Sequence, residues 1–171
     1  MTAFTTIKPS ALSREAFIET FGGVYEHSPW IAETVFAQGI GSEDDDIERL
    51  HARLAQVVRT APRAAQLALI QAHPDLAGKA AVRGELSAAS TAEQAGAGIQ
   101  DCTAEEFERF ERLNAAYKAR FGFVFIMAVK GSNRQQILAA FEERLNHTPE
   151  QEFAHALAEI DKIALFRLQA M

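Results

Sequence analysis

A histidine, a glutamate and a glutamine in the middle of this chain are residue types that could transfer protons and bind a polar ligand. His73 directly precedes Pro74, where an apolar, alanine-rich stretch is interrupted. Glu93 and Gln94 lie in a later segment, just ahead of a run of alanines and glycines. Histidine titrates near neutral pH, which suits a proton donor or acceptor. The combination indicates acid/base chemistry, and it carries no nucleotide-binding motif.

Each of these residues also has a structural interpretation, and the sequence leaves both open. His73 could end a helix, where its positive form would suit the negative end of the helix dipole. A residue before proline is disfavoured in helical conformation, however, so the His73 ring could instead point into a pocket. Glu93 completes a capping-box pattern with Ser90, in which it would bond only to the helix backbone. Arg167 could be a surface residue of a terminal amphipathic helix, or it could bind a carboxylate through two hydrogen bonds.

Metal binding by the histidines is a further possibility. Two pairs, Glu48 with His51 and Glu152 with His155, have the Glu-x-x-His spacing that helical di-iron proteins use. At about 100° per residue, these side chains mostly project away from the apolar stripes of their helices. Ligands in the core of a helical bundle must point inward, so we expect no metal site.

Composition and charge narrow the classes of protein. The chain has 171 residues, 48% of them hydrophobic, which is enough for one globular domain with a sizeable core. Its formal net charge of -6 argues against nucleic-acid binding. Cys102 is the single cysteine, so no internal disulfide can form, and we expect the protein to be cytoplasmic. No apolar run is long enough to span a membrane, and the N-terminus lacks the apolar core of a signal peptide.

Helix signals dominate the chain and predict an all-α fold. Apolar residues recur at helical spacing, whereas the wholly apolar run 123–129 cannot be assigned to a buried helix or a strand by periodicity. Capping residues or prolines mark the starts of the predicted helices, at Ser13 (running to about His27), Ser28-Pro29, Ser42, Pro62 (ending at His73), Thr103, Ser132 and Thr148. We therefore predict a single compact domain of about seven or eight helices over residues 1–171.

Five segments of the chain, taken in order, carry a family resemblance. They are residues 21–30, 73–78, 90–98, 113–126 and 159–168. Together they resemble the OHCU decarboxylases, where OHCU is 2-oxo-4-hydroxy-4-carboxy-5-ureidoimidazoline, an intermediate between urate and allantoin. The resemblance extends over about residues 10–168. It implies an all-α fold, no cofactor, a small ureidoimidazoline substrate and, commonly, a homodimer.

The resemblance also implies roles for individual residues. The catalytic histidine of the family corresponds to His73, which we expect to donate the proton that completes (S)-allantoin, and its ligand-contacting carboxylate corresponds to Glu93. Substrate contacts are implied at Pro74, Ser90, Thr91, Ala92, Gln94, Phe125, Ile126, Met127, Ala128 and Val129, and Arg167 matches the arginine that closes the pocket from the last helix. Val124 stands where the family often has proline. The alternative function is a non-catalytic helical domain that binds a ligand or a partner and keeps the family fold.

Overall fold

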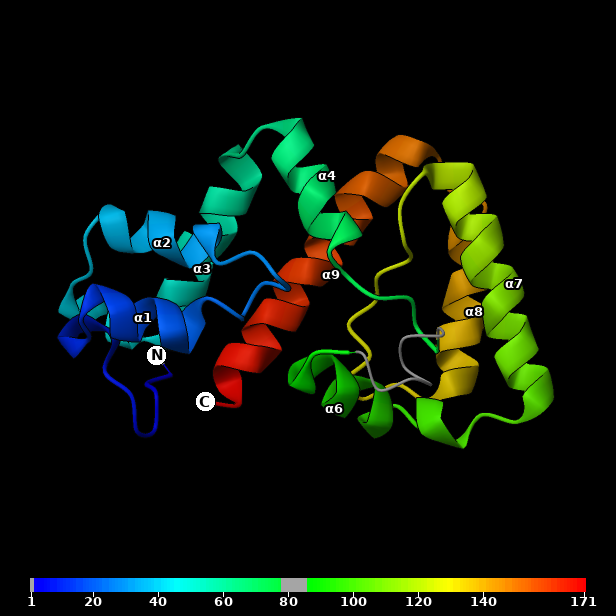
Figure 1. The fold of residues 1–171 in the computed structure, drawn as a ribbon, viewed down its shortest axis with the longest axis horizontal. Helices are drawn as coiled ribbons and strands as arrows, with labels where there is room; N and C mark the ends of the chain where they lie inside the picture. The colour runs from blue at the N-terminus through cyan, green and yellow to red at the C-terminus, as the bar shows by residue number, and fades with distance from the viewer. Residues whose placement is uncertain (1, 78–85) are drawn as a thin grey trace. The chain divides into compact units, whose positions relative to one another are not determined.

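Helices make up the regular structure throughout the part of the chain that the structure describes. This computed structural model describes residues 2–77 and 86–171 (Figure 1). In that part there are eight α-helices, and no strand forms apart from one isolated bridge between Ala3 and Asp46. The predictions of an all-α fold and of seven or eight helices are thereby confirmed. Gly78, the last residue of the matching segment 73–78, lies outside the described residues.

The α-helices of the described residues follow one another along the chain in the order of their labels. They are α1 (Arg14–Phe21), α2 (Trp30–Ala37), α3 (Ile47–Thr60), α4 (Arg63–Gln71), α6 (Ala88–Gly96), α7 (Ala104–Phe121), α8 (Arg134–Arg144) and α9 (Pro149–Gln169). Three short 3-10 helices accompany them: η1 (Pro9–Ala11), η2 (Ser42–Asp45) and η3 (Ile99–Asp101). None of the described helices combines the length and the apolar character needed to cross a membrane.

Several helix starts were predicted correctly, because their side chains satisfy free backbone amides. The Ser13 side chain accepts a hydrogen bond from Ala16 N at the start of α1. Thr103 and Glu106 form a reciprocal capping box at the start of α7. Thr148 and Gln151 form the same kind of capping box at the start of α9. Thr148 N donates to Gln151 Oε1, and Gln151 N donates to Thr148 Oγ1.

Two helix starts were predicted at the wrong residue. Helix α8 is capped by Asn133, whose side chain accepts from Gln136 N, and not by Ser132. Helix α3 is capped by Asp46, because the acidic run after Ser42 forms the separate helix η2. Asn and Asp are as effective as Ser at this position, so several neighbouring polar residues compete and the pattern leaves the register open.

The chain divides into two compact units, residues 1–72 with 161–171 and residues 73–160. In the first unit, α2 packs against α1 and α3 (Figure 1). The core there includes Phe17, whose ring centroid lies 4.8 Å from Phe21 and 5.3 Å from Phe36. Helix α1 ends at Phe21 and not near His27, because the poor helix formers Gly22 and Gly23 follow it. The prediction that residues 1–171 form one domain stays a prediction.

The second unit has its own aromatic core, centred on Tyr117 of α7. The Tyr117 ring lies 4.5 Å from Phe121, 5.4 Å from Phe125 and 6.0 Å from Phe141, measured between centroids. The rings of Phe125 and Phe141 stack at 3.8 Å. Helix α7 therefore connects this core to the segment around Phe125 and, as described below, to the segment that contains His73.

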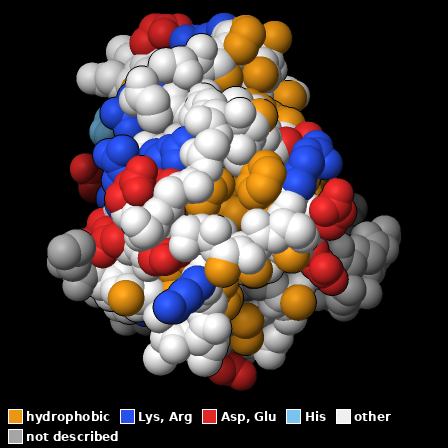
Figure 2. Space-filling view, turned by 90° about the vertical axis from the view of Figure 1, so that its left-hand side faces the viewer, with side chains coloured by type: hydrophobic (Ala, Val, Ile, Leu, Met, Phe, Trp, Pro, Cys, Tyr) orange, Lys and Arg blue, Asp and Glu red, His pale blue; other side chains and the backbone are white. Residues whose placement is uncertain are grey.

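Charged side chains of both signs are interspersed on the face shown in Figure 2. Lys and Arg side chains lie next to Asp and Glu side chains there, with apolar side chains between them. An extended surface of one charge is what binding to a nucleic-acid backbone requires. The described residues of this face do not form such a surface, in keeping with the net charge of -6.

Candidate active site

His73 lies in an irregular segment directly after α4. The helix ends at Gln71 with Ala72 as its C-cap, so it stops ahead of Pro74 as predicted, but two residues before the predicted end at His73. The His73 side chain is buried, with 8% of the residue exposed. Removing a charged group from water is costly, so a histidine that only interacts with a helix dipole is more stable in an exposed position. Burial therefore favours a functional or core role for this imidazole.

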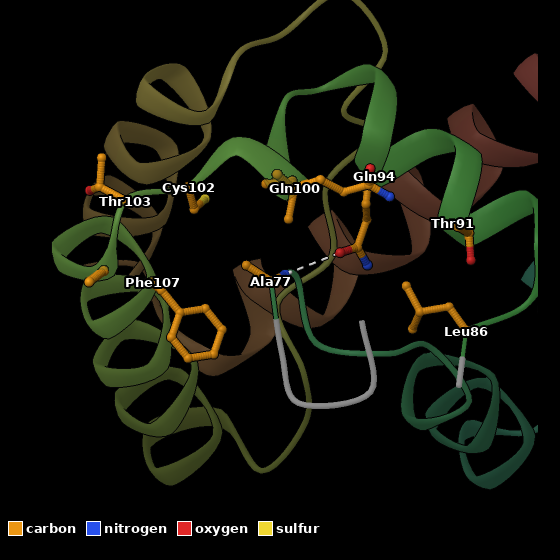
Figure 3. A pocket seen from close by; sticks show the side chains of 10 residues that line it. Ala77, Leu86, Thr91, Gln94, Gln100, Cys102, Thr103 and Phe107 are labelled. Atoms are coloured by element: carbon orange, nitrogen blue, oxygen red, sulfur yellow. Dashed lines mark hydrogen bonds between the residues drawn. The ribbon is translucent and has the colours of Figure 1, made fainter. Parts of the chain in front are cut away.

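The backbone that follows His73 is held by side chains from two helices of the second unit. Ala77 N donates to Gln94 Oε1 at 3.2 Å, and Gln94 Nε2 donates to Asp75 O at 3.4 Å. Asn114 Nδ2 donates to Leu76 O at 2.9 Å. Figure 3 shows the Gln94 amide from α6 pointing at the Ala77 backbone. These contacts fix residues 75–77 without any regular hydrogen-bonding pattern.

Two further features set the conformation of this segment. Ala77 has a φ of 52°, in the left-handed region that costs a residue with a Cβ about 1–2 kcal/mol. Lys118 of α7 forms an ion pair with Asp75, with Nζ and Oδ2 2.8 Å apart. The strained residue and the neighbouring ion pair both show that tertiary contacts, more than local preference, decide the path of the chain after His73.

Helix α6 positions Ser90, Glu93 and Gln94. The helix begins at Ala88 and is capped by Ser87, whose side chain accepts from Ser90 N at 3.2 Å. The predicted capping box between Ser90 and Glu93 is therefore wrong, because Glu93 lies in the middle of the helix. Ser90 and Gln94 are buried and Glu93 is half-buried, as the spacing of one helix face requires.

Thr91 and Ala92 project differently from their neighbours on α6. Both residues are exposed, and the Thr91 hydroxyl donates to Ser87 O at 2.9 Å. Their predicted contacts with substrate stay predictions. Pro74, next to His73, is half-buried.

A cavity of about 460 Å³ lies beside α6 in the second unit (Figure 3). Its lining includes two predicted substrate contacts, Thr91 and Gln94, together with Cys102 and Phe107. Among the described residues that line it, His73 and Glu93 are absent. Burial, followed by the nearby charge of Glu106, raises the pKa of the Cys102 thiol. At neutral pH this thiol is protonated, and a protonated thiol is a weak nucleophile.

The segment 125–129 is neither helix nor strand, which answers the ambiguity that its apolar composition left open. Phe125, Ile126 and Val129 are buried, whereas Met127 and Ala128 are half-buried. The backbone of this segment is held by side chains of two helices: Arg144 Nη1 donates to Ile126 O at 2.6 Å, and Ala128 N donates to Glu159 Oε1 at 3.4 Å. The segment can stay irregular because these two backbone groups bond to side chains and not to a helix or a strand.

A buried ion pair anchors the arginine of this arrangement. Arg144 Nε donates to Glu152 Oε1 at 2.9 Å, and the Tyr117 hydroxyl donates to the same oxygen. The Arg144 guanidinium also lies 4.3 Å from the centroid of the Phe125 ring. Burial alone would raise the pKa of Glu152, but hydrogen bonds from Tyr117 and His147 and the charge of Arg144 outweigh it and hold that pKa below its ordinary value.

Arg167 lies on α9 in the first unit, where its guanidinium has several partners. Nη2 lies 2.9 Å from Glu26 Oε2, and Nη1 donates to Gly23 O at 3.4 Å and to Val24 O at 3.3 Å. Its side chain is 8% exposed, so the interpretation as a surface arginine is wrong. Its predicted place in a pocket with His73 stays a prediction.

Comparison with known proteins identifies the family. The family model of OHCU decarboxylase matches residues 10–169. The chain belongs to the OHCU decarboxylase family. A protein of Haloferax volcanii named 2-oxo-4-hydroxy-4-carboxy-5-ureidoimidazoline decarboxylase is 40% identical over 98% of this chain and 96% of its own length. One of the same name from Amia calva is 39% identical over 94% and 90% of the two chains. The resemblance predicted from the sequence is confirmed, and the family makes this chain a carboxy-lyase.

Solved structures agree with this assignment. A crystal structure of (S)-allantoin synthase matches with a TM-score of 0.76 at 32% identity, over 95% of this chain and 51% of that one. The chain thus spans about half of that structure. A crystal structure of OHCU decarboxylase in the presence of (S)-allantoin matches with a TM-score of 0.68 over 86% and 93% of the two chains. At 22% identity, it shows the shared fold alone.

Several buried polar residues of the second unit had no predicted role in the site. Asn114 and Tyr117 lie three positions apart on the buried stripe of α7, and polar residues inside an apolar stripe are a signal that could have found them. Arg144 and Glu152 gave no such signal, because each lies in a charged stretch typical of a solvated helix. Only the tertiary structure shows that they bond to one another and support the 125–129 segment.

Proposed function

We propose that the protein decarboxylates OHCU to (S)-allantoin, that His73 donates the proton to the product, and that no cofactor takes part. The observation that carries the proposal is the buried imidazole of His73, in a segment held by Gln94 and Asn114, in a member of this family. Two relatives that match nearly the whole chain bear the name of this reaction.

The reaction sets specific demands on the protein. The bond between the ring carbon and the carboxylate breaks, CO2 leaves, and the electron pair is delocalised over the imidazoline ring and its carbonyl. A proton must then be delivered to the adjacent ring carbon, which carries the ureido group and becomes the stereocentre. The proton of the hydroxyl on the decarboxylated carbon passes, in the overall balance, to the ring nitrogen, so that this hydroxyl becomes a carbonyl. A general acid on one face of the ring gives a single enantiomer, and such catalysis is typically worth about 10²–10⁴-fold in rate.

His73 suits this task because the backbone beside it is fixed. Proton transfer depends on the placement of the donor within hydrogen-bonding distance of the reacting atom. Gln94 uses both ends of its amide on Asp75 and Ala77. In the proposed mechanism Gln94 therefore contributes chiefly by positioning the His73 segment, and Glu93 and Ser90 on the same helix contact the substrate.

The remaining contacts orient the substrate and exclude water. The apolar segment 125–129 weakens solvation of the carboxylate that is lost, and its half-buried residues Met127 and Ala128 offer backbone groups to the ring. Glu26 and two carbonyls orient the guanidinium of Arg167, as recognition of a carboxylate or imide through two hydrogen bonds requires. We also propose that the protein is cytoplasmic and forms a homodimer. Light scattering after size-exclusion chromatography measures the molar mass and so tests the homodimer.

Optical activity followed over time on freshly generated OHCU tests the proposal. The samples are the wild type, His73→Asn, His27→Asn and buffer without protein. His27 is a matched control because its side chain is 70% exposed and asparagine tolerates its left-handed backbone. We expect rapid formation of (S)-allantoin with the wild type and His27→Asn, and a loss of about 10²–10⁴-fold with His73→Asn.

Two outcomes would contradict the proposal. A folded His73→Asn protein with wild-type turnover would remove His73 as the proton donor. Slow racemic allantoin in every sample, with OHCU bound but not converted, would favour the non-catalytic ligand-binding alternative. Circular dichroism of both variants establishes that each is folded before its rate is compared.

A further inference from the structure

A second cluster of titratable side chains surrounds the start of α9, within the second unit. Glu152 lies in the first turns of α9 and is fully buried, His147 precedes the helix, and His155 follows Glu152 at helical spacing. His147 Nδ1 lies 2.9 Å from Glu152 Oε2, and His155 Nδ1 lies 3.6 Å from the same oxygen. One nitrogen or oxygen from each residue lies within 4.8 Å of the others.

The two oxygens of Glu152 have different surroundings. Oε1 accepts hydrogen bonds from Tyr117 and Arg144, which fixes the plane of the carboxylate. Oε2 is turned toward the two imidazoles. Metal-binding carboxylates are oriented in this way, by outer hydrogen bonds to the oxygen that does not bind the ion.

We propose that His147, Glu152 and His155 bind one divalent transition-metal ion, of which zinc is the best fit. Two imidazole nitrogens and one carboxylate oxygen, with a fourth position open to water, are a donor set typical of zinc. Bonds of about 2.0–2.2 Å in a tetrahedral site place ligand atoms roughly 3.3 Å apart. The observed 2.9 Å and 3.6 Å between Glu152 Oε2 and the two imidazole nitrogens lie on either side of this spacing, and all the candidate ligand atoms lie within 4.8 Å of one another, so binding requires the imidazoles to rotate toward a common point.

The exposure of the two histidines and the orientation of their rings also favour the site. The side chains of His147 and His155 are 34% and 38% exposed, so an ion can reach them from solvent and their rings can adjust. Their ring planes are already within 23° of parallel, with centroids 6.4 Å apart. Without an ion, the same residues form a hydrogen-bonded network, which is the alternative that the experiment has to separate.

The earlier expectation of no metal site considered only helical periodicity. Most side chains of the two Glu-x-x-His pairs were expected to project away from the apolar stripes, but Glu152 is fully buried, and His147 lies outside the helix, where periodicity does not apply. The other Glu-x-x-His pair is used differently: His51 Nε2 lies 2.7 Å from Asp161 O, and Glu48 accepts from the Thr2 hydroxyl.

Titration of the chelator-treated full chain with zinc sulfate tests the proposal, by calorimetry and by competition with a chromophoric zinc chelator. We expect one zinc per chain in the wild type and an affinity at least about tenfold lower in His147→Ala and in His155→Ala. Tyr117→Phe removes only a hydrogen bond to Glu152 and should weaken binding by about 10–100-fold, as loss of an outer partner typically does. His27→Asn, at an exposed histidine away from the cluster, should bind zinc like the wild type.

Three results would overturn the site: no binding by the wild type at micromolar zinc, binding that both histidine variants retain, or binding that only one of them loses. A thermal midpoint that rises with zinc in the wild type but not in His155→Ala is an independent expected readout, because an ion that binds only the folded chain stabilises it. Both measurements use no substrate, so they do not depend on the proposed decarboxylation.

Discussion

Replacement of Arg144 by methionine tests whether the buried ion pair supports the second unit. The Arg144 and Glu152 side chains are 5% and 0% exposed, and methionine keeps much of the arginine's apolar length without its charge. The substitution leaves the Glu152 carboxylate buried with two remaining partners, the neutral Tyr117 hydroxyl and the partly exposed His147 imidazole. It also removes the donor to Ile126 O in the segment proposed to contact substrate.

The magnitude follows from burial. Removal of one partner of a buried ion pair typically costs about 3–5 kcal/mol, because the other charge is left without compensation. For a chain of this size, each kcal/mol lowers the thermal midpoint by about 2–4 °C, so we expect a fall of roughly 6–20 °C. Since whole domains are stable by only about 5–15 kcal/mol, this loss is large enough to measure without ambiguity.

Urea unfolding followed by circular dichroism gives the free energy of unfolding, and the chain offers a matched control. Arg109 and Glu142 form a second Arg–Glu pair, with Nε and Oε1 3.0 Å apart, but both side chains are about half exposed. Arg109→Met should cost at most about 1 kcal/mol. If Arg144→Met costs no more than Arg109→Met, the reasoning from burial is refuted. Adding Glu152→Gln to Arg144→Met should recover part of the loss, because no buried charge then lacks its partner.

Three further predictions concern Glu152, Ala77 and Glu93. The pKa of Glu152 is lowered in the folded chain, so its carboxylate stabilises the fold above the ordinary glutamate pKa of about 4.3, and this contribution is lost as pH falls through the folded-state pKa. The difference in the free energy of unfolding between the wild type and Glu152→Gln, measured with urea, should therefore shrink as pH falls below about 4. Ala77→Gly should leave the free energy of unfolding unchanged or raise it by up to about 1 kcal/mol, because glycine adopts a φ of 52° without strain. The control Ala95→Gly, within α6, should lower the free energy of unfolding by about 1 kcal/mol, so equal losses in the two variants would contradict the assignment of strain to Ala77. Glu93→Gln should change stability by less than about 0.5 kcal/mol, because Ser87 caps α6, yet should lower the rate of (S)-allantoin formation; a stability loss without a rate loss would return Glu93 to a structural role.

Helix content and most helix starts could be predicted because they depend on short-range chemistry. A capping box such as Thr103 with Glu106 involves four consecutive residues, and an apolar stripe reports a buried face over one helix. The errors also have local causes. Asn133 and Asp46 displaced neighbouring serines as caps because all of these side chains can accept a hydrogen bond from a free amide.

The site could be predicted only in part, for a different reason. His73, Glu93 and Arg167 are proposed as site residues from motifs, but their surroundings depend on contacts between residues distant in sequence. Arg167 pairs with Glu26, and Asn114 bonds to Leu76. Such partners have no fixed spacing, so no periodic pattern reveals them.

Irregular backbone is where this limit matters most for catalysis. A helix satisfies its own amides, so its conformation can be inferred from its own residues. The segments 75–77 and 125–129 instead bond to side chains: Gln94 and Asn114 for the first, Arg144 and Glu159 for the second. Because buried backbone groups must find partners, these four residues decide the path of both segments. Replacing one of them should therefore disturb a proposed catalytic or substrate-binding segment through its backbone. Arg144 shows the limit of the motifs most clearly, because it supports the 125–129 segment and yet lies outside the five segments that carry the family resemblance.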